Sequence, residues 1–191
     1  MNKFVDIFFK GQKTTIRRSS GSHIPVLKSI AEIKNIKSVI ELGTGLFSLK
    51  TLLDKNIFRQ LEKIHSYETS DFWIEYMESQ FNDSRWNIYM IKNTDEMAKS
   101  MRSIAPVDMV FVDGTYEHRL YVLNYLKDLS DLFVLHDCEL DYFKSIMENG
   151  FKYKFVYKAP EYRYTAIFSD VIDVSKIKWN IKWDDSFKQW I

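Results

Sequence analysis

The chain of 191 residues has the size of one domain, and its hydrophobic content of 46% suffices for a substantial core. Its 27 Lys and Arg residues nearly balance its 26 Asp and Glu residues, so the composition gives no basic field for a long nucleic-acid footprint. The single cysteine, Cys138, excludes an internal disulfide framework and a cysteine-rich zinc site. Because the sequence shows no cleavable leader pattern and no run of ~18 apolar residues, we expect a soluble, cytoplasmic protein outside the membrane.

From about residue 22 onward, short apolar runs alternate with segments of helical period, which is typical of βαβ units. Strands are expected at residues 38–42, 63–68, 86–91, 107–113, 131–136, 151–157 and 163–168. Helices are expected at residues 24–33, 47–54, 71–81, 94–102, 118–129 and 140–148. The fourth and fifth strands are almost entirely apolar, which favours central parallel strands covered on both faces. Residues 1–21 are read as a polar, irregular extension, and residues 171–191 as a tail without a clear period.

A glycine pair, Gly43 and Gly45, follows the first expected strand. Glycines at such a turn let the backbone approach a ligand, and the next helix presents free N–H groups. Glu68 ends the second strand, about 20 to 25 residues further on, where an acid can bind both hydroxyls of a ribose. The pair alone fits a structural turn, and Glu68 alone fits an acid at a helix N-terminus. Together they predict a ligand with a ribose.

Two ligand classes share this geometry, nicotinamide dinucleotides and S-adenosylmethionine (SAM). The dinucleotide fingerprint has a third glycine where Ser48 stands. Glu41, two residues before the first glycine, would repel a pyrophosphate but suits the cationic methionine end of SAM. The sequence therefore favours SAM, with NAD as the alternative.

These residues resemble the class I SAM-dependent methyltransferases over about residues 22–168. The segments GSHIPVL, ELGTG, FVDG and LHDCE, in that order, are similar to small methyltransferase-like proteins of phage and bacterial genomes. The cofactor contacts that the resemblance implies are Glu41, Gly43 and Gly45 at the methionine side, Glu68 at the ribose, and Asn93 and Thr94 near the adenine. Ser48 in place of the third glycine and the loose match around Asp95 depart from the family pattern and weaken the adenine assignment.

Polar residues end the two central strands, with Asp113 after the fourth and His136 and Asp137 after the fifth. Open α/β sheets bind ligands at the carboxyl ends of neighbouring strands, so we expect these three residues to be catalytic, with Asp113 also touching the cofactor. His136 is the natural base for a hydroxyl acceptor, and Asp113 or Asp137 would orient its ring. The alternative is that His136 only forms hydrogen bonds to its surroundings.

Asp113 and Asp137 are also an alternative ligand pair for Mg²⁺, as in related metal-dependent O-methyltransferases, although Cys138 replaces the oxygen-donor amide of that pattern. No metal ligand is assigned, and Mg²⁺ is kept as an alternative cofactor. Ser22 is expected to cap the first helix, with contact of Ser22 or His23 to SAM or to the acceptor as the alternative.

The sequence as a whole predicts an α/β, Rossmann-like, doubly wound domain with a mostly parallel seven-stranded sheet and an antiparallel last strand. Residues 22–170 form its core. The predicted function is SAM-dependent methyl transfer to an oxygen nucleophile of a small molecule or glycan. An NAD-dependent oxidoreductase and a non-catalytic nucleotide-binding or assembly module are the alternatives. A nucleic-acid partner is not favoured, because no NPPY-like motif or basic stripe is present, and a homodimer is left open.

Overall fold

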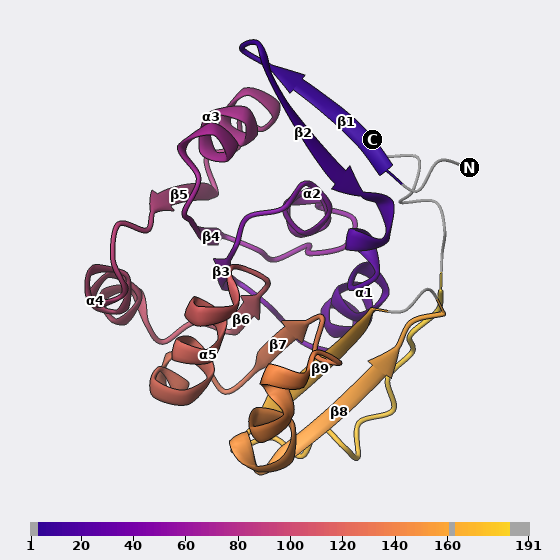
Figure 1. Cartoon of the computed structure of the whole chain (residues 1–191). Helices are drawn as coiled ribbons and strands as arrows, with labels where there is room; N and C mark the ends of the chain where they lie inside the picture. The colour runs from indigo at the N-terminus through magenta and orange to yellow at the C-terminus, as the bar shows by residue number, and fades with distance from the viewer. Residues whose placement is uncertain (1–3, 161–162, 184–191) are drawn as a thin grey trace.

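The structure, a computed structural model, describes residues 4–160 and 163–183 (Figure 1). Its centre is a seven-stranded sheet in the order β5-β4-β3-β6-β7-β9-β8. These strands are β3 (Ser38–Leu42), β4 (Lys63–Glu68), β5 (Trp86–Met90), β6 (Met109–Val112), β7 (Phe133–His136), β8 (Tyr153–Lys158) and β9 (Tyr164–Ser169). The helices are α1 (Ile24–Ile33), α2 (Leu46–Leu53), α3 (Asp71–Gln80), α4 (Thr94–Ile104) and α5 (Tyr116–Tyr125).

Strands β3 to β7 run parallel, and β9 pairs antiparallel with both β7 and β8. The expected sheet, mostly parallel with an antiparallel last strand, is therefore confirmed. Strand β6 lies at its middle and is buried along its whole length. A strand buried on both faces must be apolar at every position, which is why its sequence reads MVFV.

Helices cover both faces of the sheet (Figure 1). The apolar residues of α1, α2 and α3 pack with Met109 and Phe111 of β6, and those of α4 and α5 pack with Val110 and Val112. Successive side chains of a strand point to opposite faces, so the single strand β6 contributes to both cores. The doubly wound arrangement brings the carboxyl ends of the parallel strands to one edge.

Side chains at the helix starts fix where the chain leaves the sheet. The Ser70 hydroxyl accepts the backbone N–H of Trp73 at 3.2 Å and so caps α3. The Asn93 side chain caps α4 in the same way, accepting the N–H of Glu96 at 2.9 Å. Helix α1 has a proline in its first turn and no side-chain cap.

The N-terminal extension is a β-hairpin and not the irregular segment that the sequence suggested. Strand β1 (Phe4–Phe9) pairs antiparallel with β2 (Gln12–Arg17). Both turn residues have positive φ, 48° at Lys10 and 77° at Gly11, as a two-residue hairpin turn requires. Phe9 packs edge-on against Tyr76 of α3, with ring centroids 5.6 Å apart, which holds the hairpin on the domain.

The helix expected at residues 140–148 is present over residues 141–150, but it is not a regular α-helix. It begins as a 3-10 helix (Asp141–Phe143), continues through two α-helical residues and ends as a π-helix (Ile146–Gly150). Phe143 and Ile146 are both buried in the core. Because the segment between β7 and β8 is short, 3-10 and π turns can place both side chains in the core without a long α-helix. After β9, residues 170–183 carry no regular element, and Trp179 packs on Phe155 of β8 with ring centroids 5.8 Å apart. Residues 184–191 of the predicted tail lie outside the described residues.

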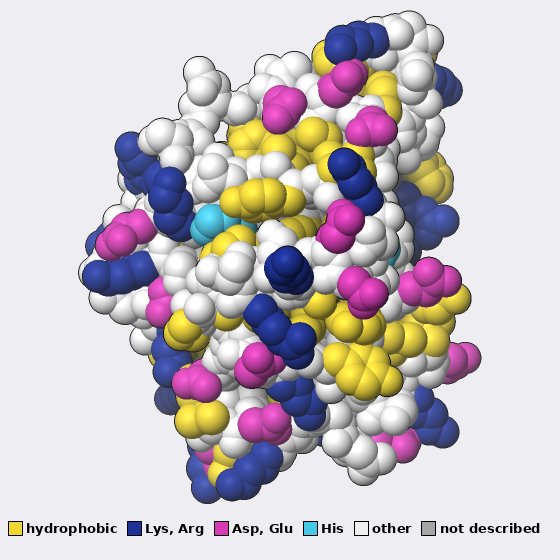
Figure 2. Space-filling model, turned by 90° about the vertical axis from the view of Figure 1, so that its left-hand side faces the viewer, with side chains coloured by type: hydrophobic (Ala, Val, Ile, Leu, Met, Phe, Trp, Pro, Cys, Tyr) yellow, Lys and Arg dark blue, Asp and Glu magenta, His cyan; other side chains and the backbone are white. Residues whose placement is uncertain are grey.

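No helix among the described residues is long and apolar enough to span a bilayer. On the face shown in Figure 2, basic and acidic side chains are interspersed between apolar ones. This mixture agrees with the near balance of charges in the sequence.

Candidate functional site

The turn after β3 is built around a contact between two backbones. Gly43 has φ of +81°, and its N–H donates to the Tyr67 carbonyl at 2.7 Å. A Cβ on Gly43 would lie 2.4 Å from the Cα of Gly114, the residue after Asp113. Any side chain there would therefore force β3 and β6 apart. Gly45 occupies the N-cap of α2, where no side-chain cap is present and the first N–H groups of the helix face the turn.

Glu41 is fully buried in β3. Its Oε2 accepts the Ser66 hydroxyl at 2.5 Å, and Ser66 in turn accepts the indole N–H of Trp86 at 2.9 Å. Burial raises the pKa of Glu41 to about 7, although neighbouring hydroxyl groups act to lower it. A cationic group beside this buried acid would stabilise its ionised form. The cationic methionine end of SAM is the group that the sequence predicts there.

Glu68 ends β4, as predicted, and one of its oxygens is already used. Oε1 accepts the backbone N–H of Thr69 at 2.6 Å and that of Ser70 at 3.0 Å. Among the described residues, Oε2 has no hydrogen-bond partner, so one carboxylate oxygen can accept from a ligand. The structure thus allows both the ribose contact and the local role at the start of α3.

A shallow hollow with a cavity volume of only about 10 Å³ lies at this edge of the sheet. Its lining residues are Leu42, Gly43, Tyr67, Glu68, Thr69, Ile91, Gly114, Thr115 and His118. Small-molecule sites usually measure roughly 300–1,000 Å³, so a cofactor would have to widen this one. Larger surface hollows, of about 460 and 410 Å³, lie around Ile36 at the amino ends of the strands. The smaller cavity is the better candidate, because ligands of open α/β sheets bind at the carboxyl ends.

Asn93 and Thr94, expected near the adenine, stand at the start of α4. The side-chain oxygen of Asn93 serves as the helix cap, and Asn93 itself is exposed. Neither residue lines the small cavity. Their contact with a cofactor therefore stays a prediction, while the capping role is a structural fact.

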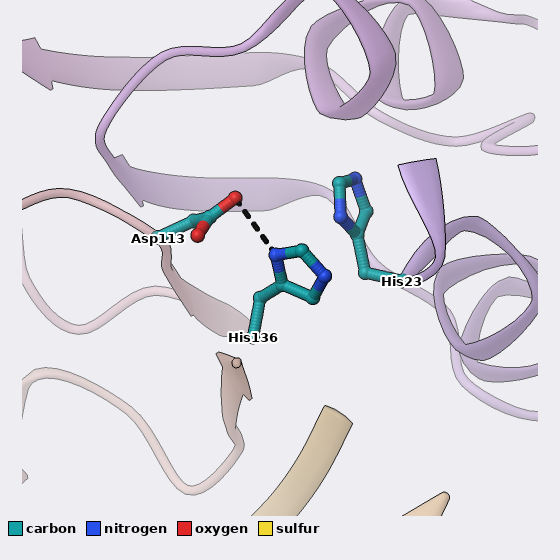
Figure 3. Close-up of side chains that lie close together, drawn as sticks. All are labelled: His23, Asp113 and His136. Carbon is teal, nitrogen blue, oxygen red and sulfur yellow. Dashed lines mark hydrogen bonds and ion pairs between the residues drawn. The ribbon is translucent and has the colours of Figure 1, made fainter. Parts of the chain in front are cut away.

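Asp113 and His136 meet at the strand ends, as expected (Figure 3). His136 Nδ1 lies 3.1 Å from Asp113 Oδ2, and Arg119 Nη2 lies 3.0 Å from Asp113 Oδ1. Burial acts to raise the pKa of Asp113, but His136 and Arg119 outweigh it and lower the pKa. Burial likewise acts to lower the pKa of His136, and Asp113 outweighs it and raises the pKa. Arg119 also donates to the His136 carbonyl at 2.9 Å, so it ties the two strand ends together.

Asp137 adopts a left-handed backbone conformation, with φ of 57°. Its Oδ2 lies 3.1 Å from Arg163 Nη1, and its buried Oδ1 lies 3.5 Å from His136 Nε2 without a hydrogen bond. All three predicted catalytic residues are thus brought together. Each carboxylate is paired with an arginine, and Asp113 Oδ2 faces a ring nitrogen of His136. Mg²⁺ prefers a shell of oxygen donors, so this nitrogen neighbour suits it poorly, and Mg²⁺ at Asp113 and Asp137 stays a prediction.

Two residues before α1 complete the cluster, Ser22 and His23, for which the sequence offered a place at the site only as the alternative to a helix cap. Ser22 does not cap α1, since His23 holds the N-cap position and has no side-chain cap. The Ser22 hydroxyl lies instead 2.9 Å from His136 Nε2. This contact occupies the nitrogen that would meet an acceptor, so the base role of His136 stays a prediction. The only sequence signal was the polar pair SH directly before an apolar helix.

No protein-family model matches the chain, and no curated protein matches it in sequence. Solved structures do match. The spermidine synthase of Thermotoga maritima has a TM-score of 0.58 at 17% identity, over 97% of this chain and 75% of that one. A Staphylococcus aureus protein provisionally assigned as a caffeoyl-CoA O-methyltransferase matches with a TM-score of 0.60 at 13% identity, over 76% of this chain and 82% of that one. Human methyltransferase-like protein 13, in complex with SAH, matches with a TM-score of 0.57 at 14% identity, over 83% of this chain and 82% of that one.

These likenesses show the fold. The chain has the class I fold of SAM-dependent methyltransferases, as its sequence resemblance implied. Aminopropyl and methyl transferases both occur among the matching structures, so the fold by itself leaves the transferred group and the acceptor open.

Proposed function

We propose that the protein is an enzyme that binds SAM and transfers its methyl group to an oxygen nucleophile of a small molecule or glycan. The observation that carries the proposal is the placement of Gly43 and Glu68 around one cavity, at the same sheet edge as Asp113 and His136. The acid and the glycine turn would bind the cofactor, and the polar cluster beside them would bind the acceptor. The two molecules would then lie next to one another, as methyl transfer requires.

When bound, SAM supplies an electrophilic methyl group on a sulfonium. Glu68 would hold the ribose hydroxyls through Oε2, and Glu41 would face the cationic methionine end. Asn93 and Thr94 would border the adenine. Asp113, His136 and Asp137 would orient the acceptor oxygen, and Arg119 and Arg163 hold the two carboxylates in place.

Two exposed tyrosines near the polar cluster favour an acceptor that has a ring with an apolar face. Tyr116 follows β6 and Tyr142 follows β7, and their ring centroids are 5.3 Å apart. Both rings are about half exposed at the edge that carries the polar cluster. Aromatic rings that stay exposed beside a site can stack on a sugar or an aromatic acceptor. A cytoplasmic location and a small-molecule or glycan partner belong to the same proposal, as does the possibility of a homodimer.

Calorimetry with SAM, S-adenosylhomocysteine and NADH tests the cofactor. We expect micromolar binding of the first two, lost in Glu68→Ala and retained in Glu78→Ala, an exposed acid on α3. Thermal unfolding of both variants shows that they are folded. Binding of NADH alone would refute the proposal and favour the oxidoreductase alternative, and the absence of any binding would also refute the proposal.

The transfer itself requires a separate assay. SAM labelled in its methyl group is incubated with extracts fractionated into small molecules and glycans, and labelled products are isolated. Label in an oxygen methyl ether or ester, reduced in Asp113→Asn, is the expected result. SAM binding without transfer to any fraction would favour the non-catalytic module.

A further inference from the structure

His23 is a buried histidine for which the fold gives no hydrogen-bond partner. Its side chain is 2% exposed, and neither Nδ1 nor Nε2 has a partner among the described residues. Its ring contacts those of Phe111 and His136, at centroid distances of 4.9 and 4.7 Å. Buried polar groups in native proteins are nearly always satisfied, so an orphaned imidazole indicates a group that binds there.

The unpartnered ring faces two further donors (Figure 3). One ligand-type atom from each of His23, Asp113 and His136 lies within 4.8 Å of the other two. The three residues come from the start of α1 and from the ends of β6 and β7, so only the tertiary fold brings them together. Two imidazoles and one carboxylate are a donor set of a transition-metal site.

We propose that His23, Asp113 and His136 bind one divalent transition-metal ion, such as Zn²⁺ or Fe²⁺. Imidazole nitrogen suits these ions, whereas Mg²⁺ prefers a shell of oxygen atoms. Metal bonds to these donors measure ~2.0–2.2 Å, so the three side chains must draw slightly closer around the ion. The site differs from the alternative Mg²⁺ pair, Asp113 and Asp137, in its set of ligands and in its metal.

The neighbours of the two strand-end ligands are already arranged as a supporting shell. Metal-bound histidines usually donate their other ring N–H to a fixed acceptor. When His136 binds through Nδ1, its proton resides on Nε2, where the Ser22 oxygen at 2.9 Å accepts it. Arg119 holds the other oxygen of Asp113, which leaves Oδ2 directed at the cluster.

Three protein ligands leave open positions on such an ion, as in catalytic metal sites. An acceptor oxygen bound there would lose its proton more easily, and His136 would then be a ligand in place of the expected base. This use of the ion rests on the proposed methyltransferase function, while the metal site itself does not.

The test uses the full chain without an affinity tag, stripped with a chelator and titrated with Co²⁺ while its visible absorption is recorded. We expect one Co²⁺ per chain, displaced by Zn²⁺. His23→Ala should weaken binding at least ~10-fold, and His23→Gln should do the same. His65→Ala is the matched control, because His65 lies on β4 beside Tyr89 and should leave the affinity unchanged.

Thermal unfolding shows whether each variant is folded. In the wild-type Co²⁺ form, proton NMR should also show shifted ring N–H signals from two histidines. The proposal is overturned if wild type binds no Co²⁺, if the folded His23 variants bind it equally well, if only one histidine is shifted, or if Mg²⁺ binds as tightly. Glu68→Ala separates the two proposals, since it should abolish SAM binding and retain Co²⁺ binding.

Discussion

Replacing Glu41 with glutamine should make the protein more stable at alkaline pH and leave it nearly unchanged at acidic pH. Glu41 is fully buried, and burial raises its pKa from 4.5 to about 7. Below pH 4.5 the carboxyl is protonated in both the folded and the unfolded chain, so it adds no penalty. As the pH rises to about 7, the unfolded chain ionises first, and the folded state loses relative stability.

The size of the effect follows from the shift. One pKa unit corresponds to about 1.4 kcal/mol, so a rise from 4.5 to about 7 costs the folded wild-type protein about 3 kcal/mol above pH 7. Glutamine carries no ionisable group and can still accept the Ser66 hydroxyl. Asp113, the charged group that acts on Glu41, raises its pKa further and is present in both proteins.

Urea unfolding of both proteins between pH 4 and 8 measures the difference. The stability curves should diverge by about 3 kcal/mol, with Glu41→Gln above wild type at pH 8. Glu62→Gln is the control, because Glu62 is exposed beside Lys37 and is solvated in both states. Parallel curves for Glu41→Gln and wild type would refute the argument from burial.

Two further substitutions test the contacts around the site. Gly43→Ala should lower the free energy of unfolding by more than ~2 kcal/mol, because its Cβ would lie 2.4 Å from Gly114 Cα. Gly11→Ala is the control: Gly11 also has a positive φ but has open space around it, so this change should cost about 1 kcal/mol. Equal losses in urea unfolding would exclude the backbone contact as the cause. Arg119→Met should cost about 2 kcal/mol, because the partly buried Asp113 would lose a charged partner and keep only His136. A loss below ~1 kcal/mol would show that Asp113 is held by His136 alone.

The arrangement of the central sheet was predictable from the sequence, and the irregular parts were not. Short apolar runs such as MVFV, bounded by polar turn residues, are typical of buried strands, and the turn at Gly43 follows the first expected strand. The N-terminal hairpin was not predicted, because Lys10 occupies the first positive-φ position of its turn, where asparagine or glycine is usual. The segment after β7 had a helical period, yet Phe143 and Ile146 reach the core through 3-10 and π turns.

The sequence by itself determined the fold class and the residues that end its strands, because burial requires a periodic pattern and a glycine turn leaves a recognisable signature. Asp113, His136 and Asp137 could therefore be assigned to one edge before any distance was known. Only the tertiary structure placed Ser22 on the His136 ring and left His23 without a partner beside it. Those contacts join residues more than 100 positions apart, and no local pattern records which buried polar groups meet across a sheet edge.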